Sequence, residues 1–139
     1  GGKRADGFDR GYYVSPTVAL AEDNATPLCQ EEIFGPFATF LTYDGIDQAI
    51  EIANQSEFGL VAYLWCSDMP TVMRVQDALQ AGTIWVNTPL ARDLRAPFGG
   101  YKNSGVGRTG GLSSRNLFTE EKVVTMPMQD FPIAKLGLG

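Results

Sequence analysis

The sequence contains no histidine, and it has only two cysteines, Cys29 and Cys66, in 139 residues. Without histidine the chain has no Ser–His or Cys–His pair for activating a nucleophile, and it lacks the commonest metal ligand, so we expect no metal site. The cysteine spacing fits neither a CxxC motif nor a zinc motif. So few cysteines also argue against a disulfide scaffold and favour a reducing, cytoplasmic setting.

The chain also lacks long apolar runs and clusters of basic residues. No stretch approaches the roughly 18 apolar residues that span a bilayer. The glycine-rich start, residues 1–11, has no apolar segment of the kind found in signal peptides. The formal net charge of −5 argues against nucleic acid and anionic membranes as partners. A hydrophobic content of 44% and a charged content of 19% are typical of one globular domain.

Strand-like and helix-like patterns alternate through the middle of the chain. Aromatic, β-branched and other apolar residues predict strands at 37–43, 60–66 and 83–86, after a short irregular strand at 14–20. Apolar residues at helical spacing, each run preceded by a capping residue, predict helices from about 44 to 55 and from about 68 to 82. We interpret this β-α-β-α-β order as an α/β fold in which helices cover a parallel sheet.

After these elements comes a long stretch, residues 87–111, which contains six glycines and two prolines. Loops of this length are usually functional or packed against another part of a protein. We expect a short helix at 113–118 and a final strand at 122–126 to follow it. The glycine pattern at 105–110 fits a dinucleotide-binding motif. However, no strand precedes it and no long helix follows, so we interpret it as a structural loop.

The acidic stretch at 31–36, Glu-Glu-Ile-Phe-Gly-Pro, allows two interpretations. Two acids beside an aromatic residue and a Gly-Pro turn can contact a ligand, or they can form an acidic loop around a buried Phe34. The motif alone favours the loop. The neighbouring acids also disfavour a thiolate at Cys29, and Cys66 ends an apolar strand. We therefore expect neither cysteine to act as a nucleophile.

A second polar motif, Arg-Asp-Leu-Arg at 92–95, follows the strand that ends at residue 86. The carboxyl side of a parallel sheet is where ligands bind. Arg92 and Arg95, with Phe98 close by, could bind a carboxylate through paired hydrogen bonds. The alternative is a solvated loop in which Asp93 pairs with one of the arginines. The motif alone favours this alternative.

Six strings, in this order, make the sequence similar to the aldehyde dehydrogenase superfamily. They are DRGYYVSPTV, CQEEIFGPF, IANQSEFGLVAYLW, ALQAGTIWVN, APFGGYKNSGVGR and FTEEKVVT, and residues 131–139 lie outside the match. The resemblance implies that residues 1–112 form the second half of the catalytic domain. It implies further that residues 113–130 form an oligomerisation arm carrying the final strand, that 131–139 are a tail, and that the protein is a homo-oligomer.

The resemblance also implies roles for individual residues. Glu32 matches the acid that holds the nicotinamide ribose hydroxyls, and Phe34 matches the aromatic residue that packs near the nicotinamide ring. Phe98 matches an aromatic residue that lines the aldehyde tunnel. The string that carries Arg92 and Arg95 resembles the branch that oxidises muconate-type semialdehydes. Those substrates are carboxylates, and this raises the carboxylate-binding interpretation above the solvated loop.

The resemblance implies a pair that braces the final strand, Arg108 and Glu120, which could form an ion pair. In the family, the nucleophilic cysteine, the general-base glutamate and most of the NAD or NADP pocket lie upstream of the matched part. We therefore expect this chain to be inactive alone and to serve as part of an NAD(P)-dependent aldehyde dehydrogenase. The alternative is a noncatalytic module that self-associates or complements a separate first half.

Overall fold

The computed structural model describes residues 1–132 and 137, and it is an α/β structure. In chain order its elements are β1 (Thr17–Leu20), α1 (Pro27–Gln30), β2 (Phe37–Phe40), α2 (Gly45–Asn54), β3 (Phe58–Gly59), β4 (Val61–Leu64), α3 (Met69–Ala78), β5 (Thr83–Val86), β6 (Tyr101–Lys102) and α4 (Gly111–Phe118). Strand β5 has the predicted bounds. Strands β1, β2 and β4 are shorter than predicted but lie inside the predicted segments.

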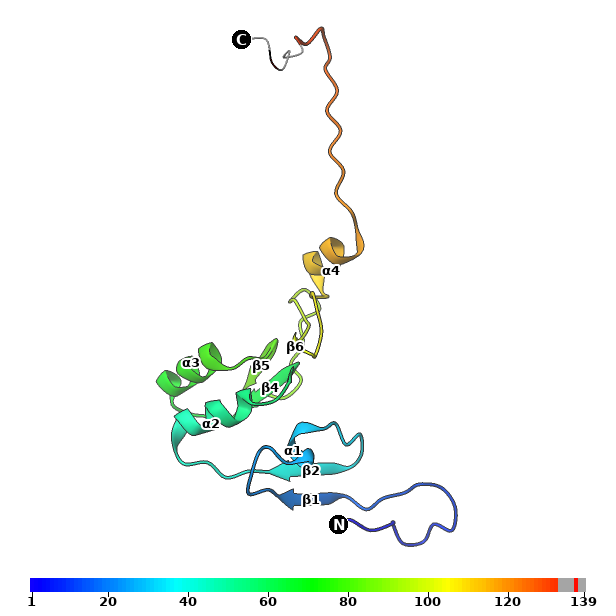
Figure 1. Cartoon of the computed structure of the whole chain (residues 1–139), viewed down its shortest axis with the longest axis vertical. Coiled ribbons are helices and arrows are strands. Elements are labelled where there is room, and N and C mark those ends of the chain that lie inside the picture. Colours follow the sequence, from blue (N-terminus) through cyan, green and yellow to red (C-terminus); the bar gives the residue numbers. More distant parts are fainter. Residues whose placement is uncertain (133–136, 138–139) are drawn as a thin grey trace.

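The strands form three pairs. β1 pairs with β2 and β4 pairs with β5, both in parallel, whereas β3 pairs with β6 in antiparallel fashion. The parallel pairing was expected, but β2, β4 and β5 do not share one sheet within the described residues. Figure 1 shows the β1–β2 pair apart from the β4–β5 pair. The local pattern predicts the type of the longer elements, β1, β2, β4, β5, α2, α3 and α4. It does not predict which strands are neighbours, because consecutive strands need not pair.

Helices α2 and α3 connect the strands, and α3 carries the best-packed side chains. Asp68 caps α3 by accepting a hydrogen bond from the backbone N–H of Thr71 at 2.9 Å. The Asp44 side chain makes no such bond at the start of α2. An ion pair between Arg74 and Asp47 joins the two helices, and they lie side by side in Figure 1.

The described part of the chain has a very small core. Among its residues, only Val72 and Val75 of α3 have buried hydrophobic side chains, at 5% and 7% exposure. One face of the β1–β2 pair is apolar and open, because Val18, Leu20 and Phe40 are 69%, 71% and 57% exposed. Exposed apolar residues that are grouped on one face typically mark a surface that another part of a protein covers.

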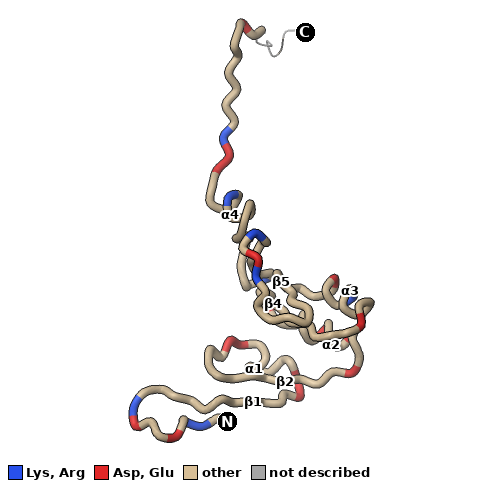
Figure 2. The backbone as a smooth tube through the Cα atoms, turned by 180° about the vertical axis from the view of Figure 1, so that it is seen from behind, with Lys and Arg blue, Asp and Glu red and all other residues tan. Residues whose placement is uncertain are grey.

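The C-terminal segment leaves the body of the molecule. After α4, residues 119–132 run away from the strands as an extended chain (Figure 1). The expected strand at 122–126 pairs with no strand of the described part, and Val123 is 90% exposed. Figure 2 shows a red and then a blue stretch just beyond α4, where the sequence has Glu120 and Glu121 followed by Lys122. We call residues 119–132 the extended arm.

Two further expectations concern the ends of the molecule and membranes. Of the expected tail, 131–139, residues 133–136 and 138–139 lie outside the described residues. Among the residues that are described, no helix has the length and apolar character required to cross a membrane.

Candidate functional site

The acidic motif forms an exposed loop between α1 and β2. Phe34 is 91% exposed, so the interpretation of this loop as a wrap around a buried phenylalanine is wrong. The backbone of Phe34 has a φ of 53°, which is uncommon for a bulky residue. Phe37 closes the turn by donating its N–H to the carbonyl of Gly35 at 2.7 Å. The turn therefore presents the flat ring of Phe34 to the outside.

Glu32 and Phe34 border two different hollows. Glu32 borders one of about 580 Å³, which Gln30, Phe58, Leu60 and Ser104 also line. Phe34 borders one of about 280 Å³, with Leu28 and Ile33 among its other lining residues. Cys29 contributes to both hollows. The acid and the aromatic ring thus lie on one loop and border two hollows that share Cys29 and Glu31 in their linings.

In the described part of the chain, neither cysteine is hydrogen-bonded to a side chain that could act as a base. The Thr26 hydroxyl donates to the sulfur of Cys29 at 3.4 Å, and the Cys66 thiol donates to the carbonyl of Asp68 at 3.6 Å. Both thiols are half-buried. Across the same residues, no cluster of acidic side chains and cysteines is suited to holding a metal ion.

The carboxyl ends of β4 and β5 are joined by one side chain, that of Asn87. Its Oδ1 accepts a hydrogen bond from the N–H of Cys66 at 2.9 Å. Its Nδ2 donates to the carbonyl of Cys66 at 2.7 Å. Sequence reasoning missed this contact. The available signal was an asparagine directly after a strand, because asparagine tolerates the left-handed backbone that ends a strand abruptly.

The loop that follows Asn87, residues 88–98, carries the two predicted arginines, and we call it the arginine loop. The guanidinium of Arg92 lies over the Phe98 ring, 4.9 Å from its centroid. Arg95 instead pairs with Asp93, with Nε–Oδ1 and Nη2–Oδ2 distances of 2.9 and 2.7 Å. This ion pair lowers the pKa of Asp93 and raises that of Arg95. The predicted alternative, an internal pair with Asp93, therefore holds for Arg95.

The two arginines thus differ in the contacts that they make. Asp93 contacts the guanidinium of Arg95 through both carboxylate oxygens, so this charge is already balanced within the loop. The two ion pairs found among the described residues do not involve Arg92. Stacking on an aromatic face leaves the N–H groups at the edge of a guanidinium available as donors. Arg92 is therefore better placed than Arg95 to bind an added carboxylate.

The glycine-rich stretch acts as a structural support, as predicted. Phe98 and Thr109 exchange two backbone hydrogen bonds of 2.7 and 2.8 Å. Gly82 packs so closely that an added Cβ would lie 1.7 Å from the carbonyl oxygen of Gly99. This close approach requires glycine and brings the stretch against the beginning of β5.

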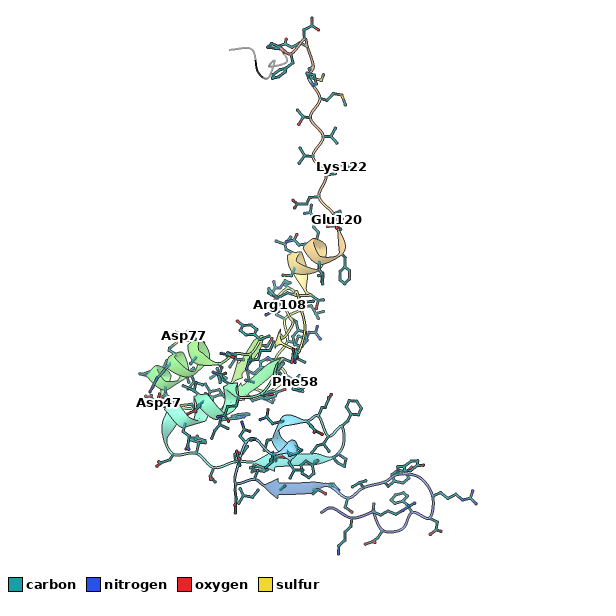
Figure 3. All side chains as sticks on the ribbon, in the orientation of Figure 1. Asp47, Phe58, Asp77, Arg108, Glu120 and Lys122 are labelled. Carbon is teal, nitrogen blue, oxygen red and sulfur yellow. The ribbon has the colours of Figure 1, made fainter. Side chains whose placement is uncertain are left out.

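Arg108 makes contacts other than the predicted ion pair. Its guanidinium donates to the carbonyls of Gly100 and Gly107 at 2.9 and 2.8 Å and lies over the Tyr101 ring. Figure 3 shows Arg108 on the body side of α4 and Glu120 beyond that helix, at the base of the extended arm. Among the described residues Arg108 and Glu120 form no ion pair, and the Arg108 guanidinium bonds local carbonyl groups instead.

The family model that matches the chain and two similar curated proteins all belong to the aldehyde dehydrogenases. The model of the aldehyde dehydrogenase family matches residues 1–124. A putative aldehyde dehydrogenase DhaS of Bacillus subtilis (strain 168) is 43% identical over 123 residues, which is 88% of this chain and 25% of that protein. A 2-aminomuconic semialdehyde dehydrogenase of Danio rerio is 45% identical over 116 residues, or 84% of this chain and 24% of that protein.

Solved structures agree with the sequence relatives. The HpcC protein from Thermus thermophilus superposes with a TM-score of 0.83 and 34% identity, covering 91% of this chain and 24% of HpcC. A Mycobacterium tuberculosis aldehyde dehydrogenase complexed with NAD⁺ gives a TM-score of 0.82 and 40% identity, covering 93% of this chain and 26% of that one. The chain thus spans about a quarter of the length of the curated relatives that it matches.

Proposed function

The chain belongs to the aldehyde dehydrogenase family, and from this membership we propose that it is part of an NAD(P)-dependent enzyme that oxidises an aldehyde to the acid. The observation that carries the proposal is the family match over residues 1–124. By the complete enzyme we mean this chain joined to the remaining part that its relatives have. Its residues 1–112 would belong to the catalytic domain and 113–130 to an oligomerisation arm.

The loop between α1 and β2 is suited to binding a dinucleotide. A carboxylate at Glu32 accepts hydrogen bonds from ribose hydroxyls, and the exposed ring of Phe34 offers an apolar face to a planar ring. Glu32 and Phe34 would hold a nicotinamide dinucleotide, which would supply the hydride acceptor that oxidation of an aldehyde requires. In this arrangement the role of Glu32 and Phe34 is to orient the cofactor.

The arginine loop makes a carboxylate-bearing semialdehyde the favoured substrate class. Arg92 lies over Phe98 at 4.9 Å, so a cation and an aromatic wall stand together in the loop that begins at the carboxyl end of β5. Guanidinium groups bind carboxylates through paired hydrogen bonds. Relatives named 2-aminomuconic semialdehyde dehydrogenase, from Danio rerio and Homo sapiens, support this choice.

A direct test compares the chain alone with the complete enzyme in aldehyde-dependent reduction of NAD. Activity is expected only in the complete enzyme, because the contacts of Cys29 and Cys66 among the described residues include no base. Turnover by the chain alone that disappears in Cys29→Ser or Cys66→Ser would show that it catalyses on its own. No turnover by the complete enzyme with any aldehyde would refute the proposed oxidoreductase function.

A second proposal, self-association, rests on the extended arm. The arm carries three exposed apolar side chains, those of Val123, Val124 and Met126, at 90%, 71% and 73% exposure. Apolar and polar residues alternate little along this part of the chain. An unpaired extended segment of this kind tends to pair with the edge of another sheet. We place Arg108 and Glu120 at the two ends of α4, where the body gives way to the arm. The complete enzyme is therefore proposed to be a homo-oligomer.

A further inference from the structure

Beyond the end of β5, side-chain hydrogen bonds take the place of further backbone hydrogen bonds between the two strands. Asn87 donates its own N–H to the carbonyl of Leu64 at 2.9 Å, which is the last backbone bond of the β4–β5 ladder. Its amide then bonds both backbone groups of Cys66, at 2.9 and 2.7 Å. The side chain therefore replaces the next residue of a strand, and the main chain is free to turn away.

The backbone of Asn87 explains how the chain leaves the sheet. Its φ is 53°, in the left-handed region, which turns the following residues out of the strand direction. The arginine loop starts at this turn. A second contact holds the loop four residues further on, where the indole N–H of Trp85 donates to the carbonyl of Ala91 at 2.6 Å. Trp85 itself stacks on Tyr63 of β4, with centroids 5.2 Å apart.

We propose that Asn87 is a positioning residue for the substrate: by holding Cys66 at both backbone groups, it fixes the direction in which the arginine loop leaves β5 and so places Arg92. This inference rests on the proposed function, in which Arg92 binds the substrate carboxylate. Asn87 itself touches no substrate in this scheme. Its effect passes through the loop, and a displacement of about 1 Å at a binding group can cost on the order of a hundredfold in rate.

Asparagine is suited to this position for two separate reasons. It offers an acceptor and a donor on one planar group, as the two backbone groups of Cys66 require. It also adopts a positive φ more readily than most residues. Asn87→Gly keeps the backbone conformation and removes both bonds. Asn87→Asp keeps one acceptor but turns an oxygen toward the Cys66 carbonyl, where the two acceptors repel.

The chain offers a matched control in Asn54, at the end of α2. Its side chain also bridges two backbone groups, because Nδ2 donates to the carbonyl of Ala78 at 2.8 Å and Oδ1 accepts from the N–H of Gln80 at 2.8 Å. Asn54→Ala removes the same kinds of bond from a site that contributes nothing to the arginine loop. It therefore measures how much activity and thermal stability are lost when a side chain that bonds two backbone groups is removed away from the arginine loop.

The test uses the complete enzyme with Asn87→Gly, Asn87→Asp or Asn54→Ala. We expect both Asn87 variants to lower kcat/KM for a carboxylate-bearing semialdehyde by about tenfold or more, and to affect a neutral aldehyde of equal length much less. Hydrogen exchange measured on peptides covering 64–66 and 88–91 should become faster in the Asn87 variants alone. Thermal unfolding should shift by similar amounts in Asn87→Gly and Asn54→Ala.

The outcomes separate the inference from the proposed function. Unchanged exchange at 88–91 in both Asn87 variants, or a loss of kcat/KM no greater than that in Asn54→Ala, overturns the positioning role. If Arg92→Ala lowers kcat/KM equally for the carboxylate-bearing and the neutral aldehyde, the proposal that Arg92 binds the substrate carboxylate is refuted. Faster exchange at 88–91 in that case still identifies Asn87 as the residue that holds the loop. If Asn87→Gly does not fold, Asn87→Asp gives the same readouts.

Discussion

Replacing Arg92 by alanine should reduce activity toward carboxylate-bearing semialdehydes far more than replacing Arg95. The two side chains lie three residues apart but have different partners. Arg92 stacks on Phe98 at 4.9 Å, and Asp93 contacts both ends of the Arg95 guanidinium at 2.9 and 2.7 Å. From the sequence alone the arginines are equivalent. The structure predicts that only Arg92 presents donors to an added carboxylate.

The magnitude follows from the hydrogen bond that is lost. A hydrogen bond to a charged group contributes about 1.5–3 kcal/mol, so Arg92→Ala should lower kcat/KM for a carboxylate-bearing semialdehyde by roughly ten- to a hundredfold. Because exposed ion pairs contribute little, Arg95→Ala should lower it by less than about fivefold. Arg92→Lys keeps the charge but not the planar fork, so it should recover only part of the loss.

The assay is steady-state reduction of NAD by the complete enzyme with two aldehydes of equal length, one ending in a carboxylate and one neutral. The neutral aldehyde controls for damage to the tunnel or to the cofactor site. Equal losses with both aldehydes in Arg92→Ala would show that the residue is structural. A larger loss in Arg95→Ala than in Arg92→Ala would refute the assignment drawn from the Asp93 contact.

Three further predictions concern the cofactor loop, the extended arm and the cap of α3. Glu32→Gln should slow single-turnover hydride transfer more than it weakens cofactor binding, because orientation affects the transition state more than the ground state; an unchanged single-turnover rate would count against this role. Deleting residues from Glu121 onward should lower the oligomeric mass measured by light scattering, and so should Val124→Pro, which removes a donor from any strand pairing; if both variants keep the parental mass, the arm is not the contact. Hydrogen bonds from Thr71 lower the pKa of Asp68 below its ordinary value of 3.8, so the capping stabilisation is present above that pH and is lost as the pH falls through the lowered pKa. Thr71→Val should therefore make the free energy of unfolding less dependent on pH below about 4, and an identical pH profile in denaturant titrations would contradict it.

Local elements were predictable because their signals are local. The strand Thr83–Val86 has its predicted bounds, and α2 and α3 lie inside the predicted helices. The capping of α3 by Asp68 was also expected, because a short polar side chain before the first turn can bond a free N–H. Each of these features is decided within a few residues of sequence.

Features decided by distant contacts were not predictable in the same way. The β3–β6 pair joins Phe58 to Lys102 across a long stretch of sequence, and each strand has two residues, too few to show a pattern. The Arg108 guanidinium donates hydrogen bonds to the carbonyls of Gly100 and Gly107 and not to Glu120. In the site, the sequence motif alone put the two arginines close to Phe98, and Arg92 does lie over that ring. Only the geometry showed that Asp93 pairs with Arg95 and not with Arg92.

The open apolar face of β1 and β2 has a consequence for the fate of the chain in a cell. Val18, Leu20 and Phe40 present a strand-like hydrophobic surface to water, and surfaces of this kind are what chaperones and quality-control proteases act on. A copy of these residues without the rest of an aldehyde dehydrogenase around them would be retained or degraded. The amount of folded protein would then depend on how completely this face is covered.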